Sequence, residues 1–276
     1  MYSYIYVCSY GKNEVRYSGI AFHEFQRYIE PKIENMILLK GDYFGKSRIV
    51  RNFNLFEGRE QINLLADETK ANGHNFGDFH FLDYTEAESV SKLTDEEIKD
   101  ILYLSHMWRS VRSPFFETLQ NRFVYLAHDD DWSCKLYMTD KESIINVIAR
   151  KIEEYTECQI NGRIGRKCQK NLRNKERKAF VKKVGKSVVC ISEHLMQRAF
   201  ENWNDGIFVD LNGMQIVKNE VIIKLYLIGR FSDMNEMFDN IQKRKGNPVQ
   251  IRCLCYGENE WSVHQIVENM QDMSRF

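Results

Sequence analysis

The sequence predicts an α+β protein that has an N-terminal unit built on a mixed or antiparallel sheet with helices, a basic helical connector, and a small C-terminal β-α-β-α unit. Three observations lead to this prediction. Short segments of alternating apolar and polar residues dominate the first half, a dense run of lysine and arginine follows, and strand and helix patterns alternate toward the end. We place the N-terminal unit at residues 1–158, the connector at 159–187 and the C-terminal unit at 188–276.

The N-terminal unit alternates predicted strands with predicted helices. Alternation of apolar and polar residues indicates strands, and apolar residues three or four positions apart indicate helices. The predicted strands cover residues 2–8, 15–22, 36–40, 76–84, 123–127 and 132–138. The predicted helices cover residues 23–29, 59–70, 94–108 and 142–155. The last two strands form a predicted hairpin across residues 128–131.

The helix predicted over residues 94–108 has the clearest start signal. Thr94 is placed to cap the first turn, and Glu97 completes a capping box that satisfies backbone N–H groups. The predicted buried stripe of this helix consists of Ile98, Ile101, Leu102 and Ser105.

The C-terminal unit shows two strand patterns, each followed by a helix pattern. The strands cover residues 220–229 and 249–256, and the helices cover residues 233–243 and 260–272. This order favours parallel strands joined by a right-handed crossover. Residues 206–211 add a further candidate strand.

Composition and the chain start predict a cytoplasmic protein without a membrane partner. The 276 residues are 43% hydrophobic and 28% charged, as in ordinary globular proteins. The chain start lacks the cationic and long apolar regions of a signal peptide, and no apolar run approaches the roughly 18 residues of a membrane span. The seven cysteines lack C-x-x-C spacing, which indicates free thiols in a reducing compartment. We expect no cofactor, a divalent metal excepted.

Residues 163–186 form a basic segment with eleven lysines and arginines and one acid, so this segment carries +10 in a chain of zero formal charge. Its cations are Arg163, Arg166, Lys167, Lys170, Arg173, Lys175, Arg177, Lys178, Lys182, Lys183 and Lys186. A narrow apolar stripe at helical spacing consists of Cys168, Leu172, Ala179, Phe180 and Val184. Good helix formers dominate the run. The segment is therefore predicted to be a helix that docks by its stripe and presents its cations.

The density of like charge in this segment indicates an acidic partner, because repulsion destabilises such a helix in isolation. A nucleic-acid backbone, an acidic protein, and acidic surface of the same chain (residues 95–97 or 129–131) each relieve the repulsion. We expect an accessory protein that binds the nucleic-acid backbone, without base readout, since no helix-turn-helix, zinc-finger or RNP signature is present. The alternative is an interaction or regulatory module that docks on an acidic protein.

A second hypothesis places a metal beside the strand predicted over residues 76–84. Asp78 and His80 share one face of that strand, and His74 lies in the preceding loop. Two imidazoles and a carboxylate match an open facial-triad site, which would make the protein a metal-dependent, nuclease-like enzyme. A loop residue beside an ordinary strand face explains the same pattern.

Overall fold

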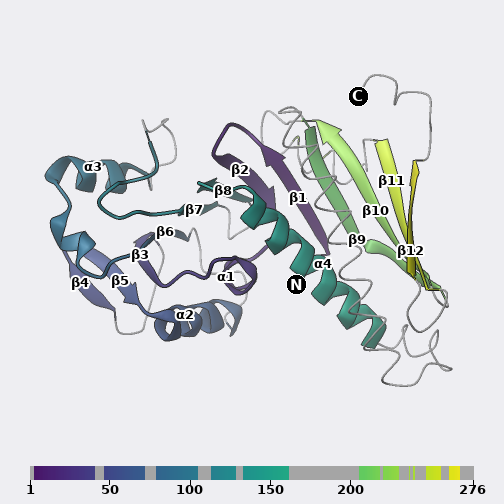
Figure 1. Cartoon of the computed structure of the whole chain (residues 1–276), viewed down its shortest axis with the longest axis horizontal. Helices are drawn as coiled ribbons and strands as arrows, with labels where there is room; N and C mark the ends of the chain where they lie inside the picture. Colours follow the sequence, from purple (N-terminus) through teal and green to yellow (C-terminus); the bar gives the residue numbers. More distant parts are fainter. Residues whose placement is uncertain are drawn as a thin grey trace. The chain divides into compact units, whose positions relative to one another are not determined.

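The computed structural model describes residues 3–40, 47–71, 79–104, 113–128, 133–161, 205–217, 220–229, 236, 239, 247–255 and 261–267. The chain divides into two compact units (Figure 1). The N-terminal unit is Tyr10–Ile144, and the C-terminal unit joins Met1–Ser9 to Ile145–Phe276. The predicted connector over residues 159–187 lies outside the described residues from position 162 onward.

The N-terminal unit is built on an antiparallel sheet. Its strands are β2 (Glu14–Ser18), β3 (Asn35–Lys40), β4 (Arg48–Val50), β5 (Phe53–Glu57), β6 (His80–Tyr84), β7 (Phe123–His128) and β8 (Ser133–Met138). They follow the order β2-β8-β7-β6-β3-β5-β4, and each neighbouring pair is antiparallel. The predicted α+β class is confirmed. The predicted hairpin is also confirmed, because β7 pairs with β8 and His128 lies opposite Ser133.

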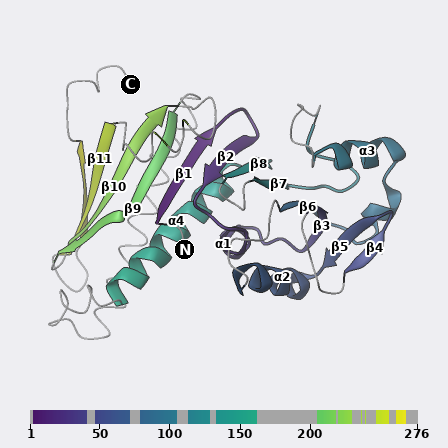
Figure 2. The same cartoon turned by 180° about the vertical axis from the view of Figure 1, so that it is seen from behind.

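Helices cover both faces of this sheet. The predicted helices form as α1 (Phe22–Tyr28), α2 (Arg59–Ala71) and α3 (Asp95–Leu104), with a short 3-10 turn, η1 (Ser89–Lys92), before α3. Figures 1 and 2 show α1 and α2 together on one face and α3 on the other. The unit therefore has three layers.

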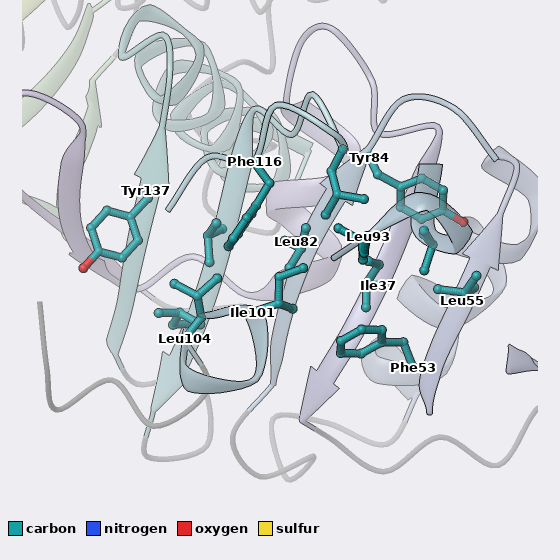
Figure 3. Close-up of a cluster of buried hydrophobic side chains, with 14 residues drawn as sticks. Ile37, Phe53, Leu55, Leu82, Tyr84, Leu93, Ile101, Leu104, Phe116 and Tyr137 are labelled. Carbon is teal, nitrogen blue, oxygen red and sulfur yellow. The ribbon is translucent and has the colours of Figure 1, made fainter. Parts of the chain in front are cut away.

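Side-chain alternation along the strands gives each face its own core. On β7, Val124 and Leu126 join a mainly aliphatic cluster on the α3 side, which we call the aliphatic cluster (Figure 3). Its other members are Ile37, Phe53, Leu55, Leu82, Tyr84, Val90, Leu93, Ile101, Leu104, Phe116, Leu119 and Tyr137. Phe123 and Tyr125 of the same strand face an aromatic core with residues of α1. In that core the Phe25 ring lies 5.1 Å from the Tyr125 ring and 6.1 Å from the Phe123 ring, centroid to centroid. Both cores exclude water, which is the main source of stability for such a sheet.

The capping box predicted for α3 is present. The backbone N–H of Thr94 donates to a Glu97 carboxylate oxygen at 2.8 Å, and the N–H of Glu97 donates to the Thr94 hydroxyl at 3.2 Å. Partial burial would raise the pKa of Glu97, but hydrogen bonds from Thr94 and Thr118 outweigh it and hold that pKa below its ordinary value. Of the predicted stripe, Ile101 is buried and Ile98 is partly buried against the aliphatic cluster, whereas Leu102 is half exposed. Leu104 is buried instead, and Ser105 lies outside the described residues.

Replacing Thr94 with alanine is expected to cost about 1 kcal/mol of stability, because the N–H of Glu97 loses its side-chain acceptor. Urea unfolding of the two proteins measures the difference. Thr94→Ser keeps the hydroxyl and should stay within a few tenths of a kcal/mol of the native protein. Equal losses for the two variants would contradict a capping role.

The C-terminal unit contains a second antiparallel arrangement of strands. These strands are β1 (Tyr4–Ser9), β9 (Asp205–Val217), β10 (Glu220–Gly229), β11 (Asn247–Cys255) and β12 (Trp261–Val267), in the order β12-β11-β10-β9-β1. Helix α4 (Glu142–Asn161) contributes to this unit from Ile145 onward. It lies near β9, where the Tyr155 hydroxyl is 3.5 Å from the side-chain oxygen of Asn212. No helix in the described ranges is long and apolar enough to cross a membrane.

The predicted β-α-β-α order is corrected in two respects. Strands β10 and β11 pair antiparallel, so they are not the parallel pair that a crossover would produce. Residues 261–267, inside the helix predicted over 260–272, form strand β12. This run satisfies helical spacing, but its valines and isoleucine also favour a strand, and periodicity alone does not decide for so short a run. The helix predicted over 233–243 lies outside the described residues except at positions 236 and 239.

Candidate functional site

The structure describes one of the residues predicted to form a site. The eleven cations of the basic segment lie outside the described residues, as do His74 and Asp78. His80 is described, at the start of β6. The basic-segment and metal hypotheses therefore stay predictions.

His80 is completely buried in the N-terminal unit. Its Nε2 atom lies 2.9 Å from the carbonyl oxygen of Ala127, and its ring lies 5.7 Å from that of His128, edge to face. A backbone carbonyl at this distance fixes the orientation of the imidazole. Among the described residues, no group of three or more His, Cys, Asp or Glu side chains is arranged to hold a metal.

A charged patch on the sheet of the N-terminal unit is the stronger site among the described residues. We name it the Arg16–Lys135 patch, and it consists of Glu14, Arg16, Lys135 and Tyr137. On β2, Glu14 and Arg16 are two positions apart and share one face. In the antiparallel register with β8, Glu14 lies opposite Tyr137 and Arg16 opposite Lys135. Tyr137 also belongs to the aliphatic cluster, so the patch adjoins this core (Figure 3).

The Glu14 carboxylate forms an ion pair with each of the two cations of the patch. The Nε of Arg16 donates to a Glu14 oxygen at 3.0 Å, and the Nζ of Lys135 lies 3.8 Å from the other oxygen. Like charges directly opposite each other on neighbouring strands are destabilising, and a single carboxylate offsets this only in part. The Arg16–Lys135 patch therefore has a net charge of +1.

Aromatic rings hold both cations in place. The Arg16 guanidinium lies over the Tyr10 ring at 4.0 Å from its centroid, and the Lys135 ammonium lies 4.7 Å from the centroid of Tyr137. Cation–π contacts of this kind are worth about 0.5–1 kcal/mol at exposed sites. They orient the cations without neutralising them.

Burial changes the acid–base properties of the patch. It lowers the pKa of Lys135, and the charge of Arg16 lowers it further, whereas Glu14 opposes both effects. Burial also raises the pKa of Tyr137 to about 12, with a contribution from Glu14. The patch therefore combines a partly buried lysine with an arginine whose side chain is 49% exposed.

Sequence reasoning missed this patch. The alternation of Glu14, Val15 and Arg16 predicts a charged strand face, but not which strand lies beside it. That Arg16 meets Lys135 depends on the pairing of β2 with β8, which brings together segments that are far apart in the chain. Comparison with protein-family models, with curated proteins and with solved structures found no match for this chain. The function proposed below therefore rests on the charges, contacts and exposure of the chain's own residues.

Proposed function

We propose that the protein is an accessory factor that binds the nucleic-acid backbone through the basic segment, residues 163–186. The observation that carries this proposal is the separation of charge along the chain. The N-terminal unit has 17 lysines and arginines against 23 acids, a net charge of −6, and the C-terminal unit has 22 against 16, a net charge of +6. The basic segment alone carries +10, which exceeds the net charge of its unit. Phosphate is the natural counter-ion for so dense a run of cations.

The Arg16–Lys135 patch supports the same proposal from the described residues. The Arg16 side chain is 49% exposed, and its guanidinium carbon lies over the Tyr10 ring, 4.0 Å from the centroid. A planar guanidinium binds phosphate oxygens in pairs, and stacking on a ring reduces the freedom it loses on binding. The patch therefore offers a second, weaker contact for an extended polyanion.

The salt dependence of binding tests the proposal. Labelled duplex DNA and single-stranded RNA are titrated with the protein over a series of salt concentrations and followed by fluorescence anisotropy. The test variant replaces four cations of the basic segment by glutamine: Arg173→Gln, Lys175→Gln, Arg177→Gln and Lys178→Gln. Each lost phosphate contact on duplex DNA lowers the slope of log affinity against log salt by about 0.9, so four contacts lower it by about 3 to 4.

A matched control removes the same number of charges from the N-terminal unit. It carries Lys12→Gln, Lys70→Gln, Lys92→Gln and Lys99→Gln, all at exposed positions. The control should keep the native slope. Equal slopes for the native protein and the basic-segment variant would overturn the proposal. Failure of the native protein to bind any nucleic acid at low salt, with an acidic protein co-purifying instead, would favour the interaction-module alternative.

A further inference from the structure

A pocket that carries several charged side chains lies between α1 and α2, on the face of the N-terminal sheet opposite the aliphatic cluster. Its volume is about 420 Å³, within the range of small-molecule sites. Figures 1 and 2 show the two helices side by side. The lining includes Gln26, Arg27, Lys32, Arg59, Asn63 and Asp67. Three of the lining residues are lysine or arginine and one is an acid, so at neutral pH these four give an excess of two positive charges.

Hydrogen bonds fix the polar groups of the pocket in place. The amide nitrogen of Gln26, a residue that is 8% exposed, donates to the side-chain oxygen of Asn63 at 2.8 Å and so joins the two helices. This bond uses the oxygen of Asn63 and leaves its amide N–H groups as donors. The Lys32 ammonium donates to the carbonyl oxygens of Arg27 at 2.6 Å and Ile29 at 3.2 Å. These bonds hold the Asn63 amide and the positive charge of Lys32 in place, and groups that are already ordered bind a ligand at a lower entropic cost.

The loop that carries Lys32 is anchored to the sheet. The Arg122 guanidinium donates to the carbonyl oxygen of Lys32 at 3.1 Å, and its Nε donates to the buried carboxylate of Asp83 at 3.1 Å. One wall of the pocket is therefore held by a buried ionic contact within the sheet.

The acids around the pocket are weakly bound competitors for its cations. Arg59 pairs with Glu34, and Lys32 pairs with Glu30 at 2.9 Å, and both acids are more than half exposed. Exposed ion pairs contribute little stability, so an entering anion displaces them at low cost. A multiply charged anion gains more than a single carboxylate, because it contacts several cations at once.

We propose that this pocket binds a small phosphate-bearing molecule. Arg27, Lys32 and Arg59 supply the charge for the phosphate, and Asn63 supplies neutral N–H donors. Asp67 is the acceptor for a hydroxyl group on the rest of the ligand. Ile33, Ala66 and the aliphatic parts of the longer side chains give the pocket apolar lining as well, which suits the carbon skeleton of such a ligand. This inference goes beyond the proposed function, because it concerns a different surface and a different class of ligand.

Calorimetric titration with glycerol 3-phosphate and with inorganic phosphate tests the inference, with glycerol as the uncharged match. We expect both phosphates to bind and glycerol not to bind. Asn63→Asp keeps the oxygen that accepts from Gln26 and adds a negative charge to the pocket, so it should weaken phosphate binding about tenfold or more without unfolding the helix. Arg27→Gln should have a comparable effect.

The control is Lys70→Gln, which removes a cation of α2 that does not line the pocket, and it should change affinity less than about twofold. Circular dichroism confirms that each variant is folded. The inference is overturned if neither phosphate binds the native protein at about 10 mM, a level far weaker than ordinary ligand sites. It is also overturned if Asn63→Asp and Lys70→Gln weaken binding equally, which would show non-specific attraction. Phosphate is also a counter-ion for the basic segment, so the larger loss of affinity in Asn63→Asp than in Lys70→Gln, two variants that leave that segment unchanged, assigns the binding to the pocket.

Discussion

Replacing Asp83 with alanine is expected to lower the free energy of unfolding by about 3 kcal/mol. Asp83 lies on β6 and is 3% exposed. One carboxylate oxygen accepts from the backbone N–H groups of Arg122 at 2.8 Å and Phe123 at 2.6 Å, and the other accepts from Arg122 Nε. Alanine leaves two backbone donors and a guanidinium without this acceptor, and buried donors that lose their partner are costly.

Asp83→Asn separates the two kinds of bond in this network. The amide oxygen still accepts from both backbone N–H groups, but the amide nitrogen meets the Arg122 donor and cannot accept from it. We expect a loss of about 1 to 2 kcal/mol, clearly smaller than that of the alanine variant. Denaturant unfolding monitored by tryptophan fluorescence measures both. Equal losses would show that the ion pair, and not the pair of backbone acceptor bonds, holds this part of the sheet.

The same carboxylate makes stability depend on pH in a predictable direction. Burial raises the pKa of Asp83 in the folded protein, although the hydrogen bonds from Phe123 and Arg122 oppose this. Between the unfolded pKa, about 3.9, and the higher folded value, the folded protein binds more protons than the unfolded chain. The contribution of Asp83 to stability therefore falls as pH rises through this interval and is constant above it. The stability advantage of the native protein over Asp83→Asn should shrink from pH 4 to pH 7, and an advantage that grows would contradict the assignment.

The helices and strands of the N-terminal unit could be predicted from the sequence because their apolar residues recur at regular spacing. Helix α2 buries Ile62, Leu65 and Ala66, whose spacing predicts one apolar helical face. The capping box of Thr94 and Glu97 depends on residues only three positions apart, so it too is visible in the sequence.

Contacts between distant segments were not predictable in this way. The bond from Arg122 to Asp83, the Arg16–Lys135 patch and the pocket between α1 and α2 all depend on which elements become neighbours. Strand register decides such contacts, and register is set by the packing of the whole sheet. The helix prediction over residues 260–272 was wrong at β12 for a related reason. The pattern of this segment is compatible with a helix or a strand, and its pairing with β11 determines which one forms.

Strand β9 offers the sharpest test of packing in the C-terminal unit. Gly206 lies beside the fully buried Tyr6 ring of β1, and a Cβ at position 206 would stand 2.5 Å from the Tyr6 hydroxyl oxygen and 2.6 Å from its Cε2. Because this glycine lies in a strand and lacks a positive φ, alanine there would otherwise stabilise the protein by about 0.4–1 kcal/mol. The clash with the Tyr6 ring makes the substitution destabilising instead, and we expect Gly206→Ala to lower the free energy of unfolding by about 2 kcal/mol.

A double-mutant cycle assigns that cost to the Tyr6 ring. In a Tyr6→Leu background the ring that meets the new methyl group is gone, so Gly206→Ala should be neutral or stabilising, which implies a coupling of about 2 kcal/mol. Hydrogen exchange of the β1 and β9 amides locates the change in the C-terminal unit, where these two strands pair. Gly11→Ala is the matched control, because no atom lies within 4 Å of its added Cβ. A Gly206→Ala loss that persists unchanged in the Tyr6→Leu background would show that the backbone at Gly206, and not the ring, sets the requirement for glycine.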